Sequence, residues 1–137
     1  MSQDVGMSIP PPLRFEFGKG SIAGEPASAL LLVTVDADGS PRIVVLSYGE
    51  VRVLDERRLR IVVRAGSNTR GNLEVRPAAL WCVLDGAAYS LRGRARRVVE
   101  APEDPLSAAL ELELESVLRD FTPDAPLISG PTYRRMT

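Results

Sequence analysis

The chain has 137 residues, 17 basic and 18 acidic side chains, a formal net charge of -1 and no histidine. The balanced charge favours neither nucleic acid nor an anionic membrane as a partner. The absence of histidine excludes serine–histidine and cysteine–histidine nucleophile pairs and histidine-ligated zinc or haem. Cys82 is the only cysteine, so we expect neither an intramolecular disulfide nor a thiolate metal cluster.

The length is typical of one domain, and we expect residues 1–137 to form a single one. No apolar run reaches the roughly 18 residues that cross a bilayer. The first residues also lack the basic and apolar regions of a secretory signal. These features predict a cytoplasmic protein that does not act at a membrane.

The first 28 residues are expected to form an arm. Residues 10–12 are three prolines, which is typical of extended polyproline-type chain. Leu13, Phe15 and Phe17 alternate with charged residues, so a short edge strand is possible here. We expect the arm to pack on the domain or on a second subunit.

Six segments in the middle of the chain have the apolar, β-branched character of strands. They are residues 29–35, 41–48, 51–54, 59–63, 78–84 and 87–99. Asp38-Gly39 and Asp85-Gly86 are strong hairpin signals, and Gly93 predicts a bulge or bend inside the last strand. Hairpins joining six strands favour an antiparallel barrel, with a sandwich as the alternative.

Two helices are expected. A short one over residues 72–76, ended by Pro77, separates the fourth strand from the fifth. A longer amphipathic helix is predicted over residues 104–121, with Asp104 as its cap and Pro105 in its first position. Its apolar face repeats at helical spacing and consists of Leu106, Leu110, Leu114, Val117, Leu118 and Phe121. The tail, residues 122–137, contains three prolines and is expected to be irregular.

The segment between the fourth strand and the short helix, residues 64–73, is rich in phosphate-binding groups. It reads Arg-Ala-Gly-Ser-Asn-Thr-Arg-Gly-Asn-Leu. Glycines allow close approach of the backbone to a ligand, and hydroxyls and arginines are the donors that a phosphate prefers. An ordinary polar loop between a strand and a helix would have the same composition.

Three segments resemble the flavin-binding split-barrel family, which includes pyridoxamine 5′-phosphate oxidase. They are the first hairpin at residues 31–42, the run Arg-Ile-Val-Val-Leu-Ser at 42–47, and Gly-Ser-Asn-Thr-Arg-Gly-Asn-Leu at 66–73 followed by Pro77. The resemblance implies a mainly β fold: a six-stranded antiparallel split β-barrel. The short helix lies between strands four and five, and the C-terminal amphipathic helix follows the barrel.

The resemblance also implies a site for flavin mononucleotide (FMN). Arg42 would bind the cofactor phosphate, and Ser67 and Thr69 would donate hydrogen bonds to it. The backbone from Val44 to Ser47 would line the edge of the isoalloxazine ring. The full set of implied cofactor residues is Arg42, Val44, Val45, Ser47, Val62, Val63, Ser67, Asn68, Thr69 and Arg70.

The chain departs from the oxidase in this same site. Asn68 and Thr69 stand where the oxidase has arginine and lysine, and Ser47 replaces a common lysine. These positive charges are lost unless Arg64 or Arg70 turns inward to compensate. The chain also ends without the oxidase's C-terminal substrate arginine and histidine. Pyridoxamine phosphate is therefore not an expected substrate.

Three functions fit these observations. The first is an FMN-dependent oxidoreductase acting on a small molecule, a homodimer with the cofactor between its subunits. No catalytic side chain and no metal ligand is assigned. The second is a deazaflavin-dependent reductase whose cofactor tail lies in a groove of Arg92, Arg94, Arg96 and Arg97, although the spacing puts Arg92, Arg94 and Arg96 on one strand face, which a solvated face explains better. The third is a non-catalytic flavin-binding or cofactor-free module.

Overall fold

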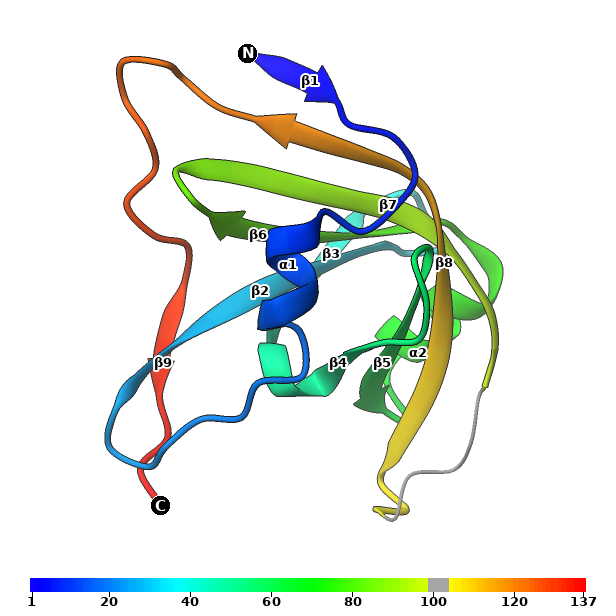
Figure 1. The fold of residues 1–137 in the computed structure, drawn as a ribbon. Coiled ribbons are helices and arrows are strands. Elements are labelled where there is room, and N and C mark those ends of the chain that lie inside the picture. Colours follow the sequence, from blue (N-terminus) through cyan, green and yellow to red (C-terminus); the bar gives the residue numbers. More distant parts are fainter. Residues whose placement is uncertain (99–103) are drawn as a thin grey trace.

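The computed structural model describes residues 1–98 and 104–137, and the side chains of residues 97 and 98 are not described. Most of the chain forms one antiparallel sheet whose strands follow the order β3-β2-β6-β7-β8-β5-β4 (Figure 1). These strands are β2 (Pro26–Val35), β3 (Pro41–Ser47), β4 (Val51–Val53), β5 (Arg58–Arg64), β6 (Ala78–Leu84), β7 (Ala87–Val98) and β8 (Ser107–Asp120). Two short strands extend the sheet to nine: β1 (Ser2–Asp4) pairs with β8, and β9 (Thr132–Arg134) pairs with β2.

The sheet curls into an open barrel. Its path begins at β3 and ends at β4, which are consecutive in the chain and are joined by a single turn of 3₁₀-helix, η1 (Tyr48–Glu50). The interior is filled by alternate side chains of the strands, as the period of a β-strand requires. Its largest fully buried members are mostly leucines, and they include Leu30, Leu32, Leu59, Leu80, Leu91, Leu110, Leu112 and Leu114.

The predicted hairpins are confirmed. Ala29 pairs with Ser47 and Val35 with Pro41 across the first hairpin, and Gly39 in its turn has φ = 90°. In the second hairpin both Asp85 and Gly86 have positive φ, 53° and 82°. Positive φ at both central residues is the conformation that matches the twist of a two-residue hairpin. The six predicted strands are therefore present, with their ends shifted by a few residues. They belong to a sheet of nine strands among the described residues, so the predicted count of six is not confirmed. The predicted end of the sixth, at residue 99, lies outside the described residues.

The predicted C-terminal helix is wrong, because residues 107–120 form the strand β8. Leu110, Leu112 and Leu114 are almost completely buried, whereas Glu113 and Glu115 between and after them are more exposed. That alternation is the period of a strand. The leucines at 106, 110 and 114 are spaced by four, which satisfies the helical period and the strand period alike. Pairing along both edges, with β5 and with β7, decides the outcome.

The N-terminal arm is ordered, and part of the prediction for it is wrong. Residues Pro11–Glu16 form the helix α1 rather than polyproline chain or an edge strand. Prolines are tolerated in a first helical turn because its N–H groups have no intrahelical acceptor. Leu13 and Phe17 are buried one turn apart, and the Phe17 ring stacks on that of Tyr48 at 5.8 Å between centroids. The arm thus packs on its own domain.

Two further differences concern local structure. The short helix α2 spans Asn68–Val75 and so begins four residues before its predicted start. The tail is not wholly irregular, because β9 lies along β2. Gly93 does sit at a break in the β7–β8 register, which confirms the predicted bulge. No helix among the described residues is long and apolar enough to cross a membrane.

Candidate functional site

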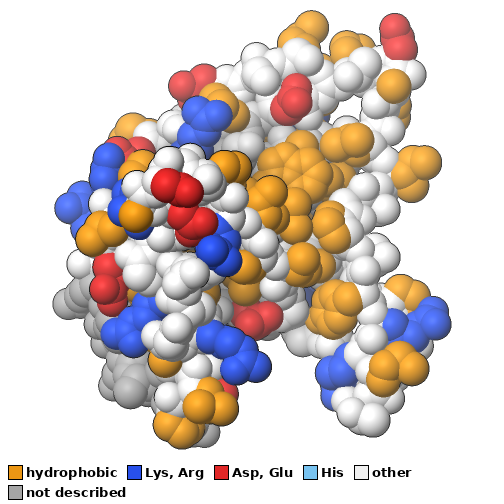
Figure 2. Space-filling model, turned by 180° about the vertical axis from the view of Figure 1, so that it is seen from behind, with side chains coloured by type: hydrophobic (Ala, Val, Ile, Leu, Met, Phe, Trp, Pro, Cys, Tyr) orange, Lys and Arg blue, Asp and Glu red, His pale blue; other side chains and the backbone are white. Residues whose placement is uncertain are grey.

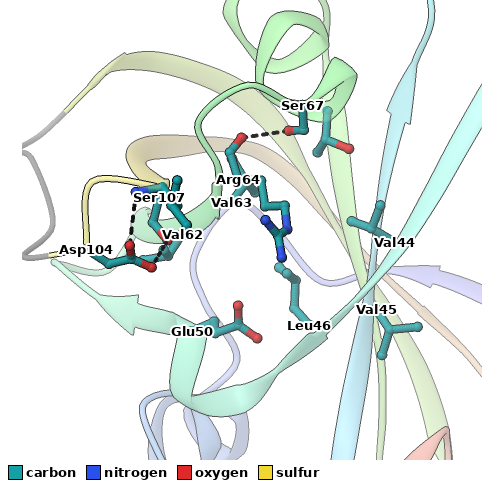
Figure 3. Close-up of a pocket in the computed structure, with 12 residues that line it drawn as sticks. Val44, Val45, Leu46, Glu50, Val62, Val63, Arg64, Ser67, Asp104 and Ser107 are labelled. Atoms are coloured by element: carbon teal, nitrogen blue, oxygen red, sulfur yellow. Dashed lines mark hydrogen bonds between the residues drawn. The ribbon is translucent and has the colours of Figure 1, made fainter.

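A cleft of about 460 Å³ opens between β3, β5, the start of α2 and the turn that leads into β8 (Figure 3). Its lining residues come from distant parts of the sequence. They are Val44, Val45, Leu46, Glu50, Val62, Val63, Arg64, Ser67, Thr69, Asp104, Leu106 and Ser107. The volume lies within the range of small-molecule and cofactor sites.

The structure brings six of the predicted cofactor residues to this cleft. They are Val44, Val45, Val62, Val63, Ser67 and Thr69. Val44 and Val45 come from β3 at one end of the curled sheet, and Val62 and Val63 come from β5, the neighbour of β4 at the other end, so the two pairs line opposite sides of the opening. They make apolar walls, which a flat aromatic ring can occupy with loss of water from both surfaces.

Ser67 and Thr69 lie at the start of α2. Ser67 is the N-cap: its Oγ accepts a hydrogen bond from the Arg70 N–H at 3.1 Å and donates one to the Arg64 carbonyl at 2.7 Å. Thr69 is only 4% exposed, and within the described part of the chain its hydroxyl makes no hydrogen bond. Its position on the cleft wall makes it available to a ligand.

Arg42 does not line the cleft. Its Nε donates to Asp36 Oδ1 at 2.9 Å, and the same carboxyl oxygen accepts from the buried Asn72 amide at 2.7 Å. The hydrogen bond from Arg42, together with that from Asn72, holds the pKa of Asp36 below its ordinary value, and Asp36 in turn raises the pKa of Arg42. Asn72 also donates to Thr34. The guanidinium predicted to bind phosphate is therefore engaged within the protein.

Three other predicted residues also lie outside the set that lines the cleft. The backbone N–H and the hydroxyl of Ser47 both donate to Glu50 Oε1 at 3.0 Å. Asn68 is exposed. Arg70 donates to Glu74 at 3.2 Å and to the Ala65 carbonyl at 3.1 Å, so it is engaged by α2 and the preceding loop.

The sequence-based set omitted several lining residues. Arg64 is the most informative of these, because it is the only cation among the described residues that line the cleft. Figure 3 shows its side chain projecting between β3 and β5 toward Leu46. Within the described residues its guanidinium donates no hydrogen bond and forms no ion pair. Its place in the polar loop of residues 64–73 is the feature of the sequence that could have identified it as a residue of the site.

Two carboxylates also line the cleft. Glu50 is held by Ser47, as described above, and Asp104 accepts hydrogen bonds from the Leu106 N–H at 2.9 Å and the Ser107 hydroxyl at 3.1 Å. Ser107 pairs with Arg64 across the β5–β8 ladder. Because residues 104–121 had been predicted as a helix, nothing in that prediction placed Asp104 beside the loop at Arg64.

Two of the four arginines considered for a deazaflavin tail form ion pairs. Arg94 lies 3.5 Å from Glu115, and Arg96 lies 2.8 Å from Glu113. Arg92 is exposed, and the side chain of Arg97 lies outside the described residues. Cross-strand ion pairs on a solvated face account for two of the four arginines.

The sequence profile of pyridoxamine 5′-phosphate oxidase matches residues 25–119, which is more than half of the chain. No curated protein matches the sequence.

Solved structures share the fold at low sequence identity. A protein of Lactobacillus delbrueckii described as a candidate pyridoxamine 5′-phosphate oxidase is 20% identical, with a TM-score of 0.63 over 83% of this chain and 97% of that one. An F420 reductase is 16% identical, with a TM-score of 0.55 over 66% of this chain and 88% of that one. An FMN-binding protein of Syntrophomonas wolfei is 15% identical, with a TM-score of 0.54 over 66% of this chain and 75% of that one. The fold, the cleft and the sequence profile together lead to one conclusion: the chain belongs to the pyridoxamine 5′-phosphate oxidase family of flavin-binding split barrels.

Proposed function

We propose that the protein is an oxidoreductase that binds FMN in the cleft between β3 and β5. The observation that carries this proposal is the composition of the cleft: apolar walls from Val44, Val62 and Val63, and hydroxyl and guanidinium donors gathered near the start of α2. FMN has the same division, with a flat apolar ring at one end and a phosphate at the other. The residues present therefore fit the cofactor.

The protein's contribution is to bind and orient. The valines exclude water from the two faces of the ring, and the strand backbone around Val45 offers hydrogen-bonding groups to its edge. When bound, the flavin supplies the hydride chemistry, so the absence of histidine from the chain is compatible with catalysis. The substrate is proposed to be a small molecule that enters beside the ring.

A deazaflavin is the second candidate cofactor. The F420 reductase among the structural neighbours supports it. Such a cofactor has a long anionic tail, for which the chain would need free cations beyond the cleft. The ion pairs of Arg94 and Arg96 leave fewer of these, and for this reason we favour FMN. A flavin-binding module without turnover is the third candidate.

The first experiment is a titration of the purified chain with FMN and with a deazaflavin, followed by visible absorbance and flavin fluorescence. We expect FMN to bind with a dissociation constant in the micromolar range or tighter, and the flavin to be reduced by a nicotinamide donor. Binding without reduction would favour the non-catalytic module, and failure of FMN to bind would refute the proposal.

A matched pair of variants locates the site. Val62→Trp fills the cleft and should abolish FMN binding. Val75→Trp makes the same change at a position on α2 that is 64% exposed and outside the cleft, and it should bind FMN normally. Equal affinity in both variants would place the cofactor elsewhere.

We also propose that the protein is a homodimer, with the cleft at the subunit interface. The outward face of β3 and its neighbours is apolar: Ile43 is 58% exposed, Val45 is 62% exposed, and Leu31, Val33 and Trp81 beside them are partly exposed. Figure 2, which views the molecule from behind, shows hydrophobic side chains gathered in the middle of this side. Large exposed apolar patches are typical of protein interfaces, and Val45 belongs to this face and to the cleft.

A further inference from the structure

We propose that Arg64, together with the Thr69 hydroxyl, holds the phosphate of the bound mononucleotide, in place of Arg42. This inference rests on the proposed function, because it names the phosphate ligands of the same cleft. It concerns two residues of this chain whose side chains have no other partner among the described residues.

The first step is the availability of the three candidate cations. Arg42 is tied to Asp36 at 2.9 Å, and Arg70 is tied to Glu74 and to the Ala65 carbonyl. Neither of these two residues lines the cleft, and their partners hold both guanidinium groups outside it. Arg64 lines the cleft, has no partner among the described residues, and points into the space between β3 and β5 (Figure 3).

The second step is the reach of Arg64. Its carbonyl oxygen lies 2.7 Å from Ser67 Oγ, so its backbone is adjacent to the first turn of α2. The side chain is exposed, and its several rotatable bonds allow the guanidinium to turn toward Thr69. An arginine fork binds two phosphate oxygens at once, which makes this contact stronger than that of a neutral donor.

The third step is the unpartnered hydroxyl of Thr69. The residue is only 4% exposed, and it lines the cleft without a hydrogen bond to any described residue. Its hydroxyl oxygen is not among the buried side-chain atoms that lack a partner, so it is open to the cleft and can donate to a phosphate oxygen there without giving up a bond within the protein. The nearby Ser67 hydroxyl cannot serve in this way because its single proton is already donated to Arg64.

The two carboxylates of the cleft, Glu50 and Asp104, do not occupy the proposed position of the phosphate. Glu50 lies at the end of the cleft opposite to Ser67 (Figure 3). Both oxygens of Asp104 accept hydrogen bonds from the turn that follows it. An anion near Ser67 and Thr69 would therefore lie at the end of the cleft opposite to Glu50. The Arg64 guanidinium, which projects toward Leu46 between these two ends, would turn toward Thr69 to bind it (Figure 3).

The test compares FMN with riboflavin, which has the same ring and lacks the phosphate. We expect Arg64→Gln to weaken FMN binding by about tenfold to a hundredfold, the range for losing a charge-assisted hydrogen bond, and to leave riboflavin affinity unchanged. Thr69→Val should weaken FMN binding by a few fold with the same selectivity. Arg14→Gln, an equal loss of charge on the exposed face of α1, is the control and should affect neither ligand.

The competing assignment is tested by Arg42→Gln. A larger loss of FMN affinity in that variant than in Arg64→Gln would overturn the inference. An unchanged FMN affinity in Arg64→Gln, or an equal loss of FMN and riboflavin, would do the same. Circular dichroism melting of each variant excludes unfolding as the cause of any loss.

A separate measurement keeps the inference distinct from the proposed function. If the wild-type chain binds no flavin at all, the proposed function fails. The magnetic resonance spectrum of isotope-labelled protein, titrated with inorganic phosphate, then still tests whether Arg64 binds an anion. Shifts of the Arg64 Nε–H and Thr69 amide resonances, absent in Arg64→Gln, would support an anion site, and unchanged resonances would overturn it.

Discussion

Gly93→Ala should be among the most damaging single substitutions in this protein. Gly93 lies in β7 at the register break against β8. A Cβ placed there would overlap the carbonyl oxygen of Glu113 and would lie 2.8 Å from the Glu113 carbonyl carbon and 3.1 Å from Leu114 Cα. All three atoms belong to the backbone of β8, so rotation of a side chain cannot relieve the overlap.

The magnitude follows from what must move. To admit the methyl group, β7 and β8 have to separate locally, although pairing from Ala88 with Asp120 to Val98 with Leu110 holds them on both sides. Losing two ladder hydrogen bonds at about 1 kcal/mol each, and loosening the leucines packed beneath them, gives a cost of about 3 kcal/mol. For a chain of this length that corresponds to a fall in Tm of about 10 °C.

Urea unfolding followed by far-ultraviolet circular dichroism measures this cost. Gly71→Ala is the matched control, because Gly71 lies inside α2 with nothing within 4 Å of the added Cβ. That variant should be more stable than the wild type by about 0.5–1 kcal/mol, the difference in helix propensity between alanine and glycine. If Gly93→Ala were within about 0.5 kcal/mol of the wild type, the close approach of β7 and β8 at this point would be refuted.

Three other predictions test different parts of the structure. The hydrogen bond from Arg42 is the main cause of the lowered pKa of Asp36. The contribution of Asp36 to stability is therefore complete above about pH 4 and is lost as the pH falls through the lowered pKa. In urea unfolding, Asp36→Asn should lose less stability on acidification than the wild type does. Burial raises the pKa of the Cys82 thiol to about 12, so this thiol should react with a disulfide reagent near pH 8 only after the protein unfolds. Rapid reaction of the native protein would contradict the buried position of Cys82. Ile43→Arg should convert the proposed dimer to a monomer in sedimentation analysis, whereas the exposed Ile128→Arg should not; a wild-type monomer would show that the apolar face of β3 has another role.

Local chemistry was enough to predict most of the sheet. Asp38-Gly39 and Asp85-Gly86 marked two hairpins because glycine and aspartate tolerate positive φ. In the structure Gly39, Asp85 and Gly86 have that conformation. Gly93 marked the bulge because only a residue without Cβ fits where two backbones meet. The motifs around Arg42 and Ser67 also indicated the family, which the sequence profile over residues 25–119 confirms. Each of these signals is contained within a few neighbouring residues.

The tertiary structure alone decided β8 and the state of each arginine. Leucines four apart satisfy both a helix and a strand, and only the two neighbouring strands, β5 and β7, select the strand at residues 107–120. The same holds for the candidate site. Arg42 and Arg64 are equally cationic in the sequence, but folding gives Arg42 the carboxylate of Asp36 and gives Arg64 an open cleft. The partner of Arg42 lies only six residues away, in the β2–β3 hairpin. The cleft that Arg64 faces is built from β3, β5, α2 and the turn before β8, and no local pattern contains that assembly.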